Sequence, residues 1–224
     1  MKKTHSRSSA KGKVRRMNRK AKSIIIRTMV TALLASAVFA ASAGASPAWK
    51  FEGKELTGTE TVVGAAIDSS LTIPGLTTKC ANFLYKLKIS NASGVGKGEV
   101  TELPLYDCTT DSPEVCTVKS ITPEVLPWAS KLITVAPSNY IVIEGIKVAI
   151  VYAGVECVLG GLTVKVTGTA GGIIDNPTEI ATFNTASFTA TKTKLSALGS
   201  SVIWNGVFPT EAFEAHRLEA ISVS

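Results

Sequence analysis

Histidine is almost absent from this chain of 224 residues, and only His216 lies beyond the first 45. A single histidine excludes the zinc sites of hydrolases, which need several histidine ligands. It leaves room for a Ser-His-Asp triad, which needs only one. No G-x-S-x-G nucleophile motif accompanies His216, however, and carboxylates surround it. The sequence therefore favours a surface histidine in or just before a terminal strand.

Long uncharged apolar runs are also missing after residue 45. The densest run of Ile and Val, 138–166, is interrupted by Glu144 and Lys147, whereas a membrane-spanning helix needs about 20 apolar residues. In the middle of this run both alternating sets of positions are largely apolar. Because β-branched side chains suit a pleated surface, the run predicts a central strand that is covered on two sides. Gly145 within it is typical of a β-bulge.

Acidic residues are absent from the first 27 residues, which carry 11 positive charges. Residues 28–40 are apolar and small, and Ala43-Gly44-Ala45 follows. This order predicts a secretory signal peptide, residues 1–45, cleaved after Ala45 or, as the second choice, after Ala43. An uncleaved membrane anchor is the alternative, although the apolar segment is short for one. Arg15-Arg16 lacks the apolar pair of a twin-arginine signal and is interpreted as ordinary leader charge.

Positive charge is scarce once the leader is set aside. Of the 24 Lys and Arg residues, 11 lie in the first 27, which leaves 13 against 17 acidic residues and a net charge of −4 for residues 46–224. Arg217 is the only arginine in that part. Nucleic-acid binding requires a basic surface, and bidentate phosphate contacts depend on arginine, so no nucleic-acid partner is expected. Membrane contact is expected only through an uncleaved leader.

Helical patterns are nearly missing from residues 46–224. The one helical candidate, 192–198, is too short to be stable alone. Residues 80–90 and 162–169 alternate apolar and polar side chains, and turn sequences such as Pro74-Gly75 separate the segments. One expected strand covers 179–189. In all, roughly ten to twelve short strands predict an all-β fold, an antiparallel β-sandwich or jelly-roll-like arrangement, in a single domain, 46–224.

Cysteine is limited to Cys80, Cys108, Cys116 and Cys157. An even set in an exported chain predicts two disulfides. The favoured pairing joins Cys108 to Cys116 across a short loop and Cys80 to Cys157. Pairing of Cys80 with Cys108 and of Cys116 with Cys157 is nearly as good, because a hairpin centred near Gly94 brings Cys80 opposite Cys108. Free buried thiols are the other possibility. A zinc site is disfavoured, because paired C-x₂-C spacings and a nearby histidine are missing.

No motif identifies a catalytic or cofactor-binding residue, and no cofactor is expected. An acidic pair for glycoside hydrolysis could come from Glu99, Glu102, Asp107 or Asp111, but such pairs are recognised by their separation in space. Oxygen-rich clusters could bind calcium, yet Asp and Asn in turns usually serve the turn itself. The two clusters are Asp107, Asp111 and Glu114, and Asp175, Asn176 and Glu179.

Tryptophan occurs only at Trp49, Trp128 and Trp204. Exposed rings would suit stacking on sugars, but core or edge packing is the more common use of a tryptophan, and Trp128 is expected to fill the core. Asn91-Ala92-Ser93 matches an N-glycosylation pattern. It lies in an expected turn, where Asn and Ser are common in any case.

Three segments of the C-terminal half, 161–172, 181–184 and 202–208, resemble secreted β-rich proteins of high-GC Gram-positive bacteria. The four-cysteine layout with its short loop 108–116 is similar too. That group has no known activity, so the resemblance implies a secreted β-rich fold and no site residues. Together with the leader it favours an exported, non-enzymatic structural or binding module. Cell-wall or extracellular carbohydrate or protein is the candidate partner. The alternative is a secreted carbohydrate-active hydrolase with an unrecognised acidic site.

Overall fold

The computed structural model describes residues 46–51, 53–209, 212–214, 217–219 and 221–223, all within one compact unit, Ser46–Ser224. The predicted leader with its cleavage sites, residues 1–45, and His216 lie outside the described residues. Among the helices of the described part, none is long and apolar enough to cross a membrane.

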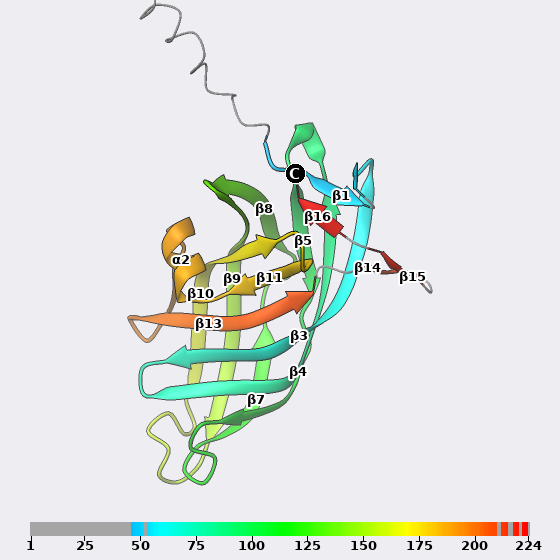
Figure 1. Cartoon of the computed structure of the whole chain (residues 1–224). Coiled ribbons are helices and arrows are strands. Elements are labelled where there is room, and N and C mark those ends of the chain that lie inside the picture. The colour runs from blue at the N-terminus through cyan, green and yellow to red at the C-terminus, as the bar shows by residue number, and fades with distance from the viewer. Residues whose placement is uncertain (1–45, 52, 210–211, 215–216, 220, 224) are drawn as a thin grey trace, which may run out of the picture. The chain divides into compact units, whose positions relative to one another are not determined.

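Strands make up most of the described chain, so the predicted all-β, antiparallel, sandwich-like fold is confirmed (Figure 1). The only helical elements there are a short 3₁₀ turn, η1 (Ala92–Gly94), and one helix, α2 (Thr185–Thr191). The strands are β1 (Trp49–Phe51), β2 (Lys54–Glu55), β3 (Thr59–Ile73), β4 (Leu76–Ser90), β5 (Lys97–Glu102), β6 (Leu105–Thr110), β7 (Thr117–Pro123), β8 (Trp128–Val135), β9 (Ser138–Ala153), β10 (Thr163–Asp175), β11 (Ile180–Phe183), β12 (Leu195–Ala197), β13 (Ser200–Pro209), β14 (Ala212–Glu214), β15 (Arg217–Glu219) and β16 (Ile221–Val223).

The central strand that the Ile- and Val-rich run predicts is β9. It pairs with β10 along one side and with β8 and β7 along the other. Its register with β10 shifts where Ile146 lies opposite Gly168 and Ile143 lies opposite Ala170. Two β9 residues there face one residue of β10, and Gly145 adopts a left-handed φ of 71°. The predicted bulge is therefore present at this glycine.

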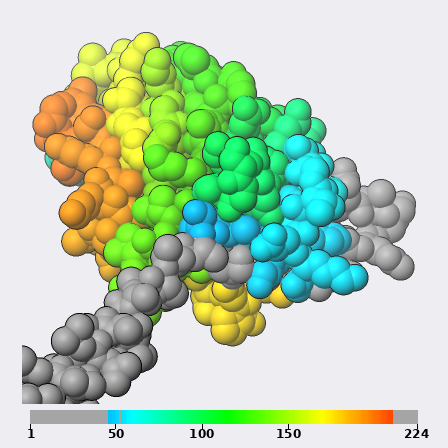
Figure 2. Space-filling model, turned by 90° about the horizontal axis from the view of Figure 1, so that it is seen from above, coloured from blue at the N-terminus to red at the C-terminus, as the bar shows by residue number. Residues whose placement is uncertain are grey.

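The main sheet closes on itself. Pairing runs from β3 through β4, β5, β8, β9, β10 and β11 to β13, and β13 pairs again with β3. Each of these pairings is antiparallel. Seen from above, the colours run from orange and yellow through green to cyan, in the order of the strands around the sheet (Figure 2). Closure satisfies the backbone groups of both edges and encloses the inward side chains.

One stretch of the wall is not joined by backbone pairing. β6 pairs with β4 and β7 pairs with β9, but no ladder joins β6 to β7 among the described strands. Beyond one end of this stretch, β5 and β8 pair and close the wall. At the other end, the loop 111–116 connects β6 to β7. The unpaired stretch between β6 and β7 is called the seam below.

Both disulfides hold strands or loops that border the seam. Cys80 of β4 is bonded to Cys108 of β6, and Cys116 in the loop 111–116 is bonded to Cys157, which follows β9. The favoured pairing of Cys108 with Cys116 and of Cys80 with Cys157 is therefore wrong, and the second pairing is the one found. The cause is strand register, because β4 and β6 place Cys80 directly opposite Cys108.

Residues 179–189, expected as one strand, divide into β11 and α2. Asn184 ends the strand and caps the helix: its Oδ1 accepts a hydrogen bond from the Ser187 N–H, and its own N–H donates to the Ser187 Oγ, each over 2.9 Å. This reciprocal pair satisfies two free N–H groups at the helix start. The helix ends at Lys192, whose φ is 56°. Residues 192–198 are not helical, as their short length predicts, and contain β12 instead.

Candidate ligand-binding cavity

Two apolar cavities lie inside the closed sheet. The seam cavity, of ≈ 50 Å³, borders the seam, and the aromatic cavity, of ≈ 60 Å³, lies among aromatic rings. Leu103 and Trp204 line both, so these two side chains separate neighbouring spaces. The other residues of the seam cavity are Ser69, Ser70, Leu71, Thr78, Cys80, Phe83, Leu105, Ile121, Trp128, Ile146, Val148, Ile150, Val166 and Leu195. Those of the aromatic cavity are Trp49, Val62, Tyr85, Leu87, Ile89, Val100, Ile141, Ile143, Ala181, Phe183, Phe208 and Pro209.

Strand alternation carries the aromatic rings into the interior. Every second residue of β13 from Val202 to Phe208 is buried, which directs Trp204 and Phe208 inward. Trp204 stacks on Phe183 of β11 with ring centroids 4.8 Å apart and 22° between the ring planes. Phe208 meets Trp204 edge-on at 5.3 Å and 89°. Such contacts stabilise beyond simple burial, so they hold the partition between the cavities in place.

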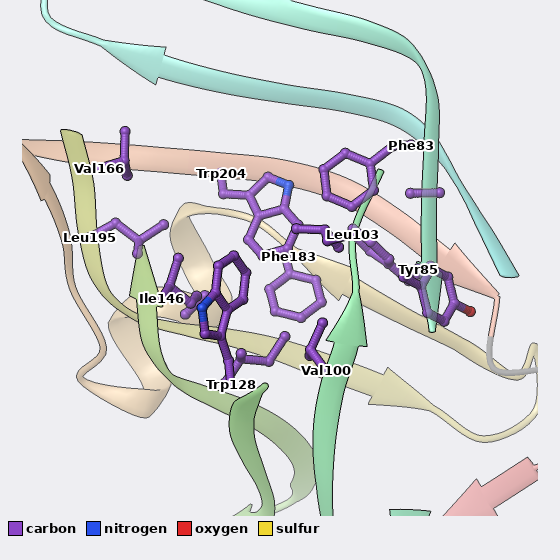
Figure 3. Close-up of a cluster of buried hydrophobic side chains, with 14 of the residues drawn as sticks. Phe83, Tyr85, Val100, Leu103, Trp128, Ile146, Val166, Phe183, Leu195 and Trp204 are labelled. Carbon is purple, nitrogen blue, oxygen red and sulfur yellow. The ribbon is translucent and has the colours of Figure 1, made fainter. Parts of the chain in front are cut away.

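The close-up view shows how the two spaces are arranged (Figure 3). Trp128, Ile146, Val166 and Leu195 lie on one side and line the seam cavity. Tyr85 and Val100 lie on the other side and line the aromatic cavity, with Trp204, Leu103 and Phe183 between the two groups. The cavities therefore follow one another through the interior.

Two side-chain hydrogen bonds involve polar groups of the seam cavity's wall. Trp204 Nε1 donates to Ser69 Oγ over 3.1 Å, and the hydroxyls of Thr78 and Tyr152 are hydrogen-bonded over 2.7 Å. Burial raises the pKa of the Tyr152 hydroxyl above 10.0; the bond to Thr78 partly offsets this, and the charge of Asp111 adds to it. No charged side chain of the described residues lines either cavity. The interior is therefore suited to uncharged, apolar groups.

The acids considered for a hydrolytic pair all lie on the outer surface. Glu99 is exposed on β5, and Glu102 forms a 3.0 Å ion pair with a lysine of β4. Asp107 accepts a hydrogen bond from an asparagine of β4 over 2.7 Å. Asp111 accepts one from a backbone N–H of β4 over 3.2 Å. None of the four lines either of the two cavities described above, so the structure does not bring an acidic pair into them.

The oxygen-rich clusters serve turns and loops. Among the described residues, the structure brings together no group of three or more His, Cys, Asp or Glu side chains that could hold a metal ion. Asp175 accepts a 2.6 Å hydrogen bond from the hydroxyl of Thr178 within the turn after β10. Glu114 is exposed on the loop 111–116. These positions follow the general use of acidic residues in turns.

All three tryptophans are buried. Their exposed fractions are 3% for Trp49, 2% for Trp128 and 6% for Trp204. The rings are therefore not exposed platforms for sugars, and the expectation of core packing, for Trp128 above all, is confirmed. Trp128 Nε1 donates to the carbonyl of Glu124 over 2.9 Å, which satisfies its one polar atom.

Sequence reasoning did not find the cavities. Their walls combine residues from twelve strands and the segment around Leu103, and no local sequence pattern predicts which inward side chains leave space between them. The available signal is weak: small residues such as Ser69 and Ala181 occupy inward positions among large aromatic ones. Comparisons with protein-family models, curated proteins and solved structures found no match for the chain. The fold and its interior therefore carry the functional argument.

Proposed function

We propose that this chain is an exported, non-enzymatic binding protein that encloses a small apolar ligand inside its closed sheet. The observation that carries the proposal is the pair of neighbouring cavities, whose walls are apolar and without charge. Protein sites for small molecules are concave and mostly apolar. A closed sheet of about eight strands has an interior just wide enough to be filled by side chains or to hold one small ligand.

Export is supported by two independent features. The two disulfides suit an oxidising compartment, since cytosolic thiols are kept reduced. The basic and apolar segments of residues 1–45 have the order of a signal peptide. The resemblance to secreted β-rich proteins of high-GC Gram-positive bacteria agrees with both, and it makes a bacterial extracellular protein the preferred form of the proposal.

Ligand binding is tested by tryptophan fluorescence. Trp204 lines both cavities, and Trp49 and Trp128 line one each, so a short brominated chain such as 4-bromobutanoic acid should quench the emission saturably. Two substitutions that fill the cavities, Val166→Phe and Ala181→Leu, should weaken binding by about tenfold, the loss expected for about two displaced methylenes. The same replacements at exposed strand positions, Val63→Phe and Ala129→Leu, are the controls. Quenching that never saturates, or that all four variants retain equally, would contradict the proposal.

Export is tested by the intact mass of the protein from culture medium and from membranes, alkylated with and without prior reduction. A species in the medium that begins near Ser46 and takes up four alkyl groups only after reduction supports export with cleavage and two disulfides. A membrane-bound, full-length species that is alkylated without reduction argues against both cleavage and disulfide formation.

A further inference from the structure

We infer that the seam between β6 and β7 is the opening through which ligand reaches the interior, and that the ligand is an unbranched alkyl chain. The inference rests on the proposed function, since it names the ligand class and the access route of the same cavities. It comes from a stretch of the wall where two neighbouring strands, β6 and β7, share no ladder although residues of both line one cavity.

The seam cavity reaches both sides of this interruption. Leu105 of β6 and Ile121 of β7 line the cavity, and both are only half-buried. Next to the seam, β6 is joined to β4 and β7 to β9 by backbone ladders, so a ligand would have to break a ladder to pass between those strands. Between Leu105 and Ile121 only side chains need to move, and side-chain rotation is far faster than strand separation.

Both ends of the seam are held in place. At one end Val100 of β5 pairs with Trp128 of β8. At the other end the disulfide Cys116–Cys157 ties the loop 111–116 to the segment after β9, and the Thr78–Tyr152 hydrogen bond crosses the interior. The disulfide Cys80–Cys108 fixes β6 to β4. The opening is therefore limited in length, and the surrounding wall keeps its shape while side chains move.

The shape of the interior selects the ligand class. The interior offers two small neighbouring spaces with Leu103 and Trp204 between them. A narrow flexible chain can enter such a space, whereas a rigid ring system needs one broad space. Because no charged side chain of the described residues lines the cavities, a polar head group has no partner inside and stays at the outer face of the seam.

The access route is tested by stopped-flow quenching with 4-bromobutanoic acid. Leu105→Ala and Ile121→Ala widen the opening and should raise the association rate constant by up to about tenfold, and Leu105→Trp should lower it. The dissociation rate constant should change in the same direction, so the Kd, which is the ratio of the two rate constants, should change much less than either of them. Tyr106→Ala and Thr122→Ala, at exposed positions of the same two strands, are the matched controls and should keep the wild-type rates.

The ligand class is tested with alkanoic acids and alkanols of increasing length. Affinity should rise about fourfold for each added methylene until the space is filled, and acid and alcohol of equal length should bind alike. Tighter binding of a fused-ring probe of equal carbon number would overturn the alkyl assignment. Saturable binding with seam variants that associate at the wild-type rate would overturn the access route while leaving the proposed function in place. Absence of saturable binding in the wild-type protein would overturn the proposed function and this inference together.

Discussion

The hydroxyls of Thr78 and Tyr152 lie 2.7 Å apart in a buried hydrogen bond that crosses the interior. Thr78 belongs to β4 and Tyr152 to β9, two strands that do not pair with each other. The bond therefore links the strands that pair with β6 and with β7, beside the seam cavity, which Thr78 lines. Its two hydroxyls satisfy each other where water is excluded, so removal of one leaves the other without its partner.

Tyr152→Phe should lower the free energy of unfolding by about 1–3 kcal/mol, because the Thr78 hydroxyl loses its partner inside the core. Urea denaturation followed by fluorescence measures the change. Tyr106→Phe is the matched control, since Tyr106 is 55% exposed, and it should leave stability nearly unchanged. Equal stability of Tyr152→Phe and the wild type would show that the bond contributes nothing.

The same tyrosine predicts an alkaline loss of stability. Burial raises the pKa of Tyr152 in the folded protein above the 10.0 of the unfolded chain, so at pH values between the two pKa values the folded state binds more protons. The stabilisation is complete below pH 10.0 and declines as the pH rises towards the folded-state pKa. Unfolding measured from about pH 9 to 11 should show a shallower decline for Tyr152→Phe than for the wild type. Tyr106→Phe should keep the wild-type slope.

The two disulfides should be reduced in a defined order. Cys116 and Cys157 are 6% and 8% exposed, whereas Cys80 and Cys108 are more accessible. Brief treatment of the folded protein with a thiol reductant, followed by alkylation and peptide mass mapping, should label Cys80 and Cys108 first. Replacement of both Cys116 and Cys157 by Ser should cost roughly 3–4 kcal/mol in the chain-entropy model, given a separation of 41 residues. Labelling of Cys116 and Cys157 first would contradict the burial argument.

Two buried serines should respond in opposite directions to the same substitution. Ser130 Oγ has no hydrogen-bond partner among the described residues, while Ser187 Oγ donates to the carbonyl of Gly171 over 2.6 Å. Ser130→Ala removes an unsatisfied polar atom and should be neutral or stabilise by up to about 1 kcal/mol. Ser187→Ala breaks this bond and the half of the capping box in which Ser187 Oγ accepts from the Asn184 N–H, and should destabilise by about 1–2 kcal/mol. Thermal unfolding of the wild type and both variants measures whether each substitution raises or lowers stability.

Asn91 should be a structural residue and not a glycosylation site. Its Oδ1 accepts from the Trp49 N–H over 2.7 Å, and its Nδ2 donates to the carbonyls of Trp49 and Leu56 over 2.8 and 3.1 Å. Asn91→Ala loses all three bonds and should cost about 2–3 kcal/mol. Asn91→Asp should be at least as damaging, because a carboxylate would face two carbonyl oxygens. Asn139→Ala is the control, because the hydrogen bond that Asn139 Oδ1 accepts from the Thr134 hydroxyl over 2.8 Å is exposed.

The strand pattern was predictable because it is local. The two-sided apolar run became β9, Gly145 became a bulge, and residues 80–90 became the alternating part of β4. The expected strand 179–189 failed at Asn184, where a side-chain cap competes with strand formation. The cap depends on hydrogen bonds between Ser187 and Asn184. Because Asn and Ser are also common in turns, the sequence alone does not distinguish a helix cap here from a turn.

By itself, the sequence determined the all-β class, the central strand and the burial of Trp128. These features depend on the alternation of apolar and polar side chains, on β-branched residues and on turn residues, and all three can be recognised within short segments of the chain. Only the tertiary structure decided the disulfide pairing, the closure of the sheet, the seam and the two cavities. Each of these depends on the register of strands far apart along the chain, such as Thr78 meeting Tyr152 over 74 positions. Register is settled by the packing of many side chains at once, and no short segment contains that information.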